Sequence, residues 1–109
     1  MTKKTEITEN PNHIENGLVL TEIQIWPVRD PEASRIKAMA SLTFNGCLRM
    51  NGCRLIEGAR GMFLSFPSEK KLGTDTWVSL VHPVTRQGSE RIQQLTVARY
   101  QALVDMVAG

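Results

Sequence analysis

The sequence of 109 residues has little of what marks secreted, membrane or disulfide-bonded proteins. No stretch approaches the roughly 20 apolar residues that cross a bilayer, and residues 1–16 are polar, unlike a secretory signal. Cys47 and Cys53 would lie about 20 Å apart on one continuous strand, too far for a disulfide. We therefore expect a cytoplasmic protein with reduced thiols and no membrane partner.

Catalytic and metal-ligating patterns are also missing. His13 lies in the polar N-terminal segment and His82 precedes Pro83, and neither has the neighbours that a zinc site needs. No set of Ser, His and Asp stands out as a catalytic triad. We predict that the protein is not an enzyme and uses no catalytic residue, metal ion, cofactor or small-molecule substrate.

The composition is that of an ordinary globular domain, with 41% apolar and 22% charged residues. The net charge of +2 does not by itself indicate nucleic-acid binding, which would require a local basic cluster. A single domain of this length buries only part of its unfolded surface, and forming a dimer would bury more.

The chain divides into a polar tail and one folded domain. Residues 1–17 contain almost nothing to bury and are predicted to be a disordered tail, so the domain spans residues 18–109. A helix is predicted over 90–107, with Ser89 as its N-cap. Alternating apolar residues predict strands at 20–28, 34–44, 47–57, 62–66 and 76–82. The fold class is therefore α+β, an antiparallel sheet of about five strands followed by one C-terminal helix packed on it.

Apolar spacing also predicts details of this fold. Every second residue from Ile36 to Phe44 lies on one face of a strand. Asn45-Gly46 indicates a hairpin turn, and an odd-length loop over 44–46 would place Leu42 opposite Leu48. Asn51-Gly52 is interpreted as a β-bulge or a close-contact site. The apolar stripe of the helix is predicted at Ile92, Leu95, Ala98, Ala102 and Met106, with Leu103 beside it.

Four segments, taken in order and spacing, resemble the SpoVG (stage V sporulation protein G) family. They read Ala-Met-Ala-Ser-Leu-Thr at 38–43, Arg-Leu-Ile-Glu-Gly at 54–58 with Gly-Met-Phe-Leu at 61–64, Phe-Pro-Ser at 66–68, and Val-His-Pro-Val at 81–84. The corresponding family patterns are Ala-Ile-Ala-Ser-Ile-Thr, Arg-Val-Ile-Asp/Glu-Gly with Gly-Leu-Phe-Val, Met-Pro-Ser and Ala-His-Pro-Ile. The resemblance runs from about Thr21 to Leu103 and implies a dimeric regulator that binds DNA or RNA and has no chemistry of its own.

The resemblance implies that the basic loop after Pro-Ser and the start of the helix contact nucleic acid. Phosphates attract basic side chains and helix N-termini. The candidate binding residues are Lys70, Lys71, Arg86, Arg91 and Arg99. The loop departs from the family pattern, because Glu69 separates Pro-Ser from the basic pair and Lys replaces Arg, which can alter target preference. The plainer alternative is that these residues are ordinary solvated surface.

The apolar residues of the central strands suggest a second subunit. Met39, Leu55 and Phe63 are predicted to lie opposite the main apolar set, and a second apolar face needs cover. We therefore expect a homodimer with sheet contacts. Aromatic residues could stack on the bases of a single strand, although aromatic residues at alternating strand positions more often belong to a core; the candidates are Trp26, Phe63, Phe66, Trp77 and, foremost, Tyr100.

Two functions of different class follow. The first is a small DNA- or RNA-binding regulator, connected with septation or with developmental gene control. The second is a protein-interaction module in division or envelope control, without nucleic-acid binding.

Overall fold

The computed structural model describes residues 12–30 and 32–108, with side chains as far as Met106. Within these ranges the chain forms seven strands and one helix: β1 (His13–Glu15), β2 (Leu18–Pro27), β3 (Ile36–Phe44), β4 (Leu48–Gly58), β5 (Gly61–Ser65), β6 (Ser68–Lys70), β7 (Trp77–Ser79) and α1 (Arg86–Ala108).

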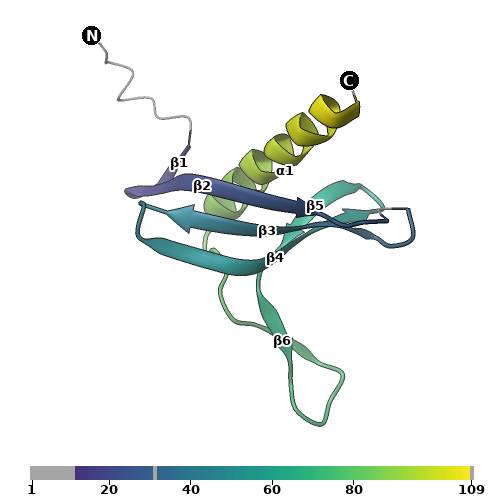
Figure 1. Ribbon diagram of the computed structural model, residues 1–109. Coiled ribbons are helices and arrows are strands. Elements are labelled where there is room, and N and C mark those ends of the chain that lie inside the picture. Colours follow the sequence, from purple (N-terminus) through teal and green to yellow (C-terminus); the bar gives the residue numbers. More distant parts are fainter. Residues whose placement is uncertain (1–11, 31, 109) are drawn as a thin grey trace.

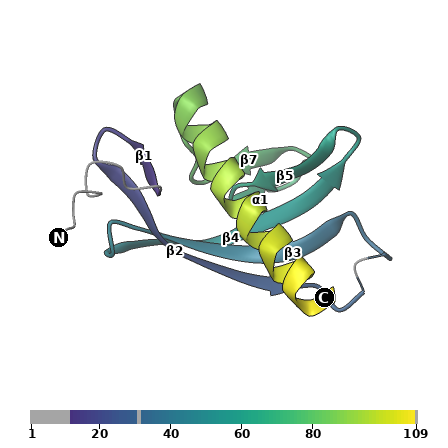
Figure 2. The same cartoon turned by 90° about the horizontal axis from the view of Figure 1, so that it is seen from above.

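The strands form two separate sheets. The larger is antiparallel with the order β1-β2-β3-β4-β5, and α1 runs diagonally across one of its faces (Figures 1 and 2). The smaller is a hairpin of β6 and β7, called here the arm (residues 68–80), which projects from the sheet away from α1 (Figure 1). The predicted α+β class, an antiparallel sheet of about five strands followed by one C-terminal helix, is confirmed.

The core lies between α1 and the sheet face that α1 covers. Every second residue of β3 from Ala38 to Phe44 is buried, as predicted, together with Leu20 of β2 and Leu64 of β5. The helix contributes Ile92 and also Thr96, whose hydroxyl donates a 2.8 Å hydrogen bond to the Ile92 carbonyl. Because this bond satisfies the Thr96 hydroxyl within the helix, a polar side chain is tolerated in the core.

The packed face of α1 differs from the predicted stripe. Ala98, Ala102 and Met106 are exposed. The C-terminal turns of α1 rise away from the sheet, so apolar residues there have nothing to cover (Figure 1). The side chains that pack toward the core are Ile92, Leu95, Thr96, Val97 and Tyr100. Tyr100, the foremost candidate for base stacking, is therefore half-buried against the core.

The β3–β4 hairpin has an odd-length loop, as predicted, but its register differs by two residues. Leu42 lies opposite Met50 rather than Leu48, because the loop lies one residue further along the chain. Asn45 and Gly46 have φ values of +52° and +65°. Positive φ at both central positions is what a type I′ turn requires, and Asn-Gly adopts it readily.

The predicted bulge at Asn51-Gly52 is confirmed, and it exchanges the two faces of β4. The ladder shifts register between Ala40 and Leu42, and Gly52 adopts a φ of +86°. An extra residue in one strand reverses the alternation beyond it. Leu55 is consequently buried in the core, so the prediction that it shares the opposite face with Met39 and Phe63 is wrong. We call the face that α1 does not cover the outer face.

Two strand predictions are also corrected. Residues 13–15 form β1 with Ile14 buried, so the predicted disorder of 12–17 is wrong, and residues 1–11 lie outside the described residues. One apolar residue between polar neighbours is too short a pattern to indicate a strand. The segment 76–82 contributes only β7, which pairs with β6, and β1 supplies the fifth strand of the large sheet.

Candidate nucleic-acid interface

The arm carries the first two candidate residues at its tip. Lys70 ends β6 and Lys71 begins the connecting loop, and both side chains are exposed. The Lys70 ammonium lies 3.4 Å from the Asp75 carboxylate, across the loop. Lys71 makes no ion pair with any described residue. An exposed pair contributes little free energy, so both ammonium groups can turn toward a phosphate.

The other three candidates lie on α1 and differ in their surroundings. Arg86 is exposed and pairs with Glu90 one turn later, at 3.1 Å. Arg91 is half-buried, and its Nε donates a 3.3 Å hydrogen bond to the His13 carbonyl, so it fastens β1 to the helix. Arg99 is exposed and has no ion-pair partner among the described residues.

The start of α1 differs from the prediction in a way that bears on phosphate binding. The helix begins at Arg86, and Thr85 rather than Ser89 is the N-cap, with its Oγ1 accepting a 3.0 Å hydrogen bond from the Gly88 N–H. The Thr85 hydroxyl in turn donates a hydrogen bond to the Glu15 carboxylate from β1. A carboxylate of the chain itself therefore stands at the positive end of the helix dipole, where a phosphate was expected to bind.

The five candidates form two groups rather than one cluster. Lys70 and Lys71 lie on the projecting arm, whereas the three arginines follow the helix (Figure 1). Arg86 and Arg99 are about 20 Å apart along the axis at 1.5 Å per residue, and about 140° apart around it. Arg91 and Arg99 point within about 80° of each other. A ligand that contacts both groups must therefore be extended.

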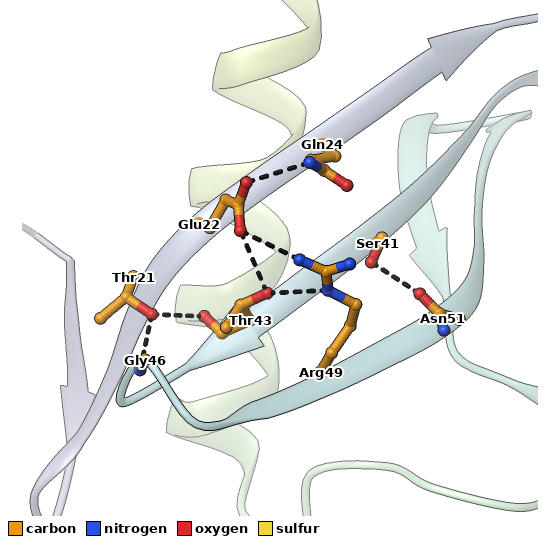
Figure 3. A network of polar contacts seen from close by, with 8 residues as sticks. All are labelled: Thr21, Glu22, Gln24, Ser41, Thr43, Gly46, Arg49 and Asn51. Carbon is orange, nitrogen blue, oxygen red and sulfur yellow. Dashed lines mark hydrogen bonds and ion pairs between the residues drawn. The ribbon is translucent and has the colours of Figure 1, made fainter.

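The outer face carries a polar network that the sequence analysis missed (Figure 3). The Glu22 carboxylate accepts hydrogen bonds from Gln24 at 3.0 Å and from Arg49 at 3.3 Å. Thr43 links the same two charged groups, and Ser41 donates a 2.8 Å hydrogen bond to Asn51. Because Glu22 already compensates Arg49, this end of the outer face offers little net positive charge. The alternating polar residues in 22–24 and 41–43 could have indicated this network from the sequence.

Other kinds of site find no support in the described part of the chain. Among residues 12–30 and 32–108, no three His, Cys, Asp or Glu side chains gather as metal ligands would. The single helix described there is not long and apolar enough to span a membrane. Burial raises the pKa of the Cys53 thiol to about 11, which leaves it protonated and unreactive at neutral pH.

Comparison with known proteins assigns the family. The SpoVG family model matches residues 18–102, from the start of β2 to the last third of α1. The chain belongs to the SpoVG family. The matched region includes all five candidate basic residues and the four segments that resemble the family.

Curated relatives in the SpoVG family agree with this assignment. The chain is 32% identical to a protein of Phytoplasma australiense over 79% of this chain and 86% of that protein. It is 26% identical to one of Caldicellulosiruptor bescii over 78% and 93% of the two chains, and 34% identical to one of Finegoldia magna over 62% and 61%. All three bear the name "Putative septation protein SpoVG".

Proposed function

We propose that this protein is a small regulator that binds DNA or RNA, connected with septation or with developmental gene control. Membership of the SpoVG family supports the proposal, because the family resemblance implies such binding. The names of the relatives support the connection with septation. The observation that carries the binding proposal is the exposure of cations on two separate elements, with Lys71 and Arg99 lacking ion-pair partners in the described structure.

The energetics of these cations favour a phosphate ligand. The two exposed ion pairs, Lys70–Asp75 and Arg86–Glu90, are each worth about 0–1 kcal/mol, so phosphates can displace the carboxylates. Neutralising about four phosphates gives a slope of log affinity against log salt near −3 to −4. Arg91 is hydrogen-bonded to β1, so we expect it to maintain the shape of the binding site rather than to supply a charge for a phosphate.

The test is fluorescence anisotropy with labelled duplex DNA, single-stranded DNA and RNA at about 50 and 200 mM salt. We expect affinity for the preferred nucleic acid to fall roughly 100-fold between these conditions. The double variant Lys70→Glu/Lys71→Glu should weaken binding at both salts. It should also make the salt slope shallower by roughly 2, because two phosphate contacts are lost.

The matched control is Arg29→Glu/Arg60→Glu, which makes the same charge change in the exposed β2–β3 and β4–β5 connections. If only net charge matters, both double variants lose affinity equally, and the arm is not the site. Absence of binding by any nucleic acid at low salt would overturn the proposed function itself.

A specific observation favours a second function, protein interaction, for which we propose a second copy of this chain as the partner. Large apolar side chains are exposed along the arm and just beyond it: Leu72, Trp77, Val78, Leu80, Val81 and Val84. A two-stranded hairpin is marginally stable alone, so an apolar cover would stabilise it. Sedimentation equilibrium should show a dimer that Trp77→Ser/Leu80→Ser dissociates, and a monomer at micromolar wild-type protein would contradict it.

A further inference from the structure

The outer face carries, beside its polar network, a row of side chains that crosses four strands and is apolar on β2 and β3 and polar on β4 and β5. In the ladder, Trp26 of β2 lies opposite Met39 of β3, Met39 opposite Arg54 of β4, and Arg54 opposite Ser65 of β5. Trp26, Met39 and Phe63 are 53%, 36% and 41% exposed. Such a row on an open sheet face is a surface that needs a ligand or a partner.

The neighbouring row extends this surface along β4 and β5. Phe63 lies opposite Ile56, and its ring lies 3.0 Å from where a β-carbon at Gly58 would stand, so the absence of a side chain at Gly58 gives the ring its place. With strands about 4.8 Å apart, Trp26 and Phe63 are separated by three strand spacings, roughly 14 Å across the sheet. The two aromatic side chains therefore stand at opposite sides of one platform.

Cations without carboxylate partners lie within and beside this platform. Arg54 is half-buried between Met39 and Ser65 and makes no ion pair with a described carboxylate. Arg99, equally unpaired, lines a groove of about 320 Å³ together with Trp26, at the free edge of β2. From α1 across the edge of β2 to β4, the surface therefore carries Arg99, then Trp26 and then Arg54.

We propose that the outer face is a stacking platform for the bases of a single-stranded nucleic acid, on which Trp26 and Phe63 stack bases while Arg54 and Arg99 hold the phosphates. This rests on the proposed function and names the form of nucleic acid it binds. Stacking needs unpaired bases with open faces, which a duplex does not offer. The exposed Asn51 side chain beside the platform, whose oxygen accepts a hydrogen bond from the buried Ser41 hydroxyl, supplies an amide group that can contact base edges. The cations of the arm reach the same strand further along its backbone.

The experiment uses two single-tryptophan proteins, Trp77→Phe, which keeps Trp26, and Trp26→Phe, which keeps Trp77. The two tryptophans are almost equally exposed, so each protein is the matched control of the other. Each is titrated with an oligonucleotide of about 12 nucleotides, with an abasic oligonucleotide of the same length, and with duplex DNA. Anisotropy of a label on the oligonucleotide reports binding, and tryptophan emission reports stacking.

We expect the base-bearing strand to quench Trp26 more strongly than the abasic strand does, whereas Trp77, which lies opposite Lys70 in the arm, should respond equally to the two strands. Trp26→Ala should weaken binding to the single strand roughly 5- to 100-fold and change binding to duplex within about twofold. Single-stranded DNA and RNA oligonucleotides, tested in parallel, show which sugar the platform prefers.

Each other outcome overturns the platform. Binding without quenching of Trp26, or with equal affinity for the abasic strand, refutes it while the proposed function stands. No anisotropy change with any nucleic acid refutes both. Trp26 emission that changes with protein concentration alone, together with a Trp26→Ala variant that is monomeric, would show that a second copy of the chain covers this face instead.

Discussion

Two antiparallel hairpins in this protein both carry large apolar side chains, and these side chains have opposite fates. In the β3–β4 hairpin, residues Ala38, Ala40, Leu42 and Phe44 are almost completely buried beneath α1. In the arm, every residue from Glu69 to Leu80 is exposed, including Trp77. The difference comes from what lies opposite each hairpin, because an apolar pattern is buried only where another layer covers it. The first hairpin stabilises the fold, and the second presents a surface.

The largest effect should come from the same substitution in the two hairpins. Leu42→Ala removes a fully buried side chain and should lower the free energy of unfolding by about 2–5 kcal/mol. Leu80→Ala, at a position that is 56% exposed, should change it by less than about 0.5 kcal/mol. Urea unfolding followed by circular dichroism measures both. A comparable loss in the Leu80 variant, at a protein concentration at which the chain is monomeric, would mean that the arm belongs to the cooperative core.

The second largest effect should be a pH dependence of the free energy of unfolding, which comes from Cys53 in the core. Burial raises the pKa of this thiol to about 11 from an ordinary value of 9.0. A thiol with a raised folded-state pKa keeps its proton in the native state, so its full contribution to stability is present below pH 9 and is lost as pH rises toward 11. Two pKa units correspond to roughly 2–3 kcal/mol.

Urea unfolding between about pH 8 and 10.5 should therefore show a steeper loss of stability in the wild type than in Cys53→Ala. The difference between the two proteins isolates Cys53, because the other groups that titrate in this range are common to both. Cys47→Ala, in the exposed hairpin turn, is the control and should retain the wild-type slope. Parallel curves for wild type and Cys53→Ala would contradict the prediction.

A smaller effect is expected at the junction between the arm and the helix, where the structure and the sequence prediction name different caps. Thr85→Ala removes the Oγ1 that accepts the Gly88 N–H, and should cost about 1 kcal/mol of stability. Ser89→Ala should cost less, because its hydroxyl accepts only the Gln93 side chain and Ala favours the helix interior. Thermal unfolding of the two variants compares them. The reverse order would restore Ser89 as the cap.

The fold was predictable from the sequence where one local pattern decided the structure. Alternation placed Ala38 to Phe44 on the buried face, and Asn51-Gly52 marked the bulge correctly. Leu55 was misplaced because one inserted residue reverses every later position, an effect that alternation alone does not reveal. The role of β1 depends on a long-range contact, in which Glu15 meets Thr85 seventy residues later.

The candidate site was predictable only as a set of residue types. The basic residues could be named from the sequence and the family resemblance, but their division between arm and helix depends on the projection of the β6–β7 hairpin. The apolar segment 76–82 was expected to join the large sheet, because its composition is that of a buried strand. Nothing local distinguishes a strand that is covered by its own chain from one that awaits a partner.

The smallest effect on stability should come from a charge change in the arm. Such a change should alter nucleic-acid affinity and leave the free energy of unfolding almost unchanged. Asp75→Asn removes the carboxylate 3.4 Å from Lys70 and should change the free energy of unfolding by less than about 0.5 kcal/mol, since the pair is exposed. It should also raise nucleic-acid affinity a few-fold at about 50 mM salt, because a phosphate no longer competes with Asp75. Anisotropy titrations measure this gain against Asp105→Asn, the same charge change at an exposed position of α1. Equal gains in the two variants would reduce the arm to a contributor of net charge, whereas a gain confined to Asp75→Asn would locate phosphate contact at its tip.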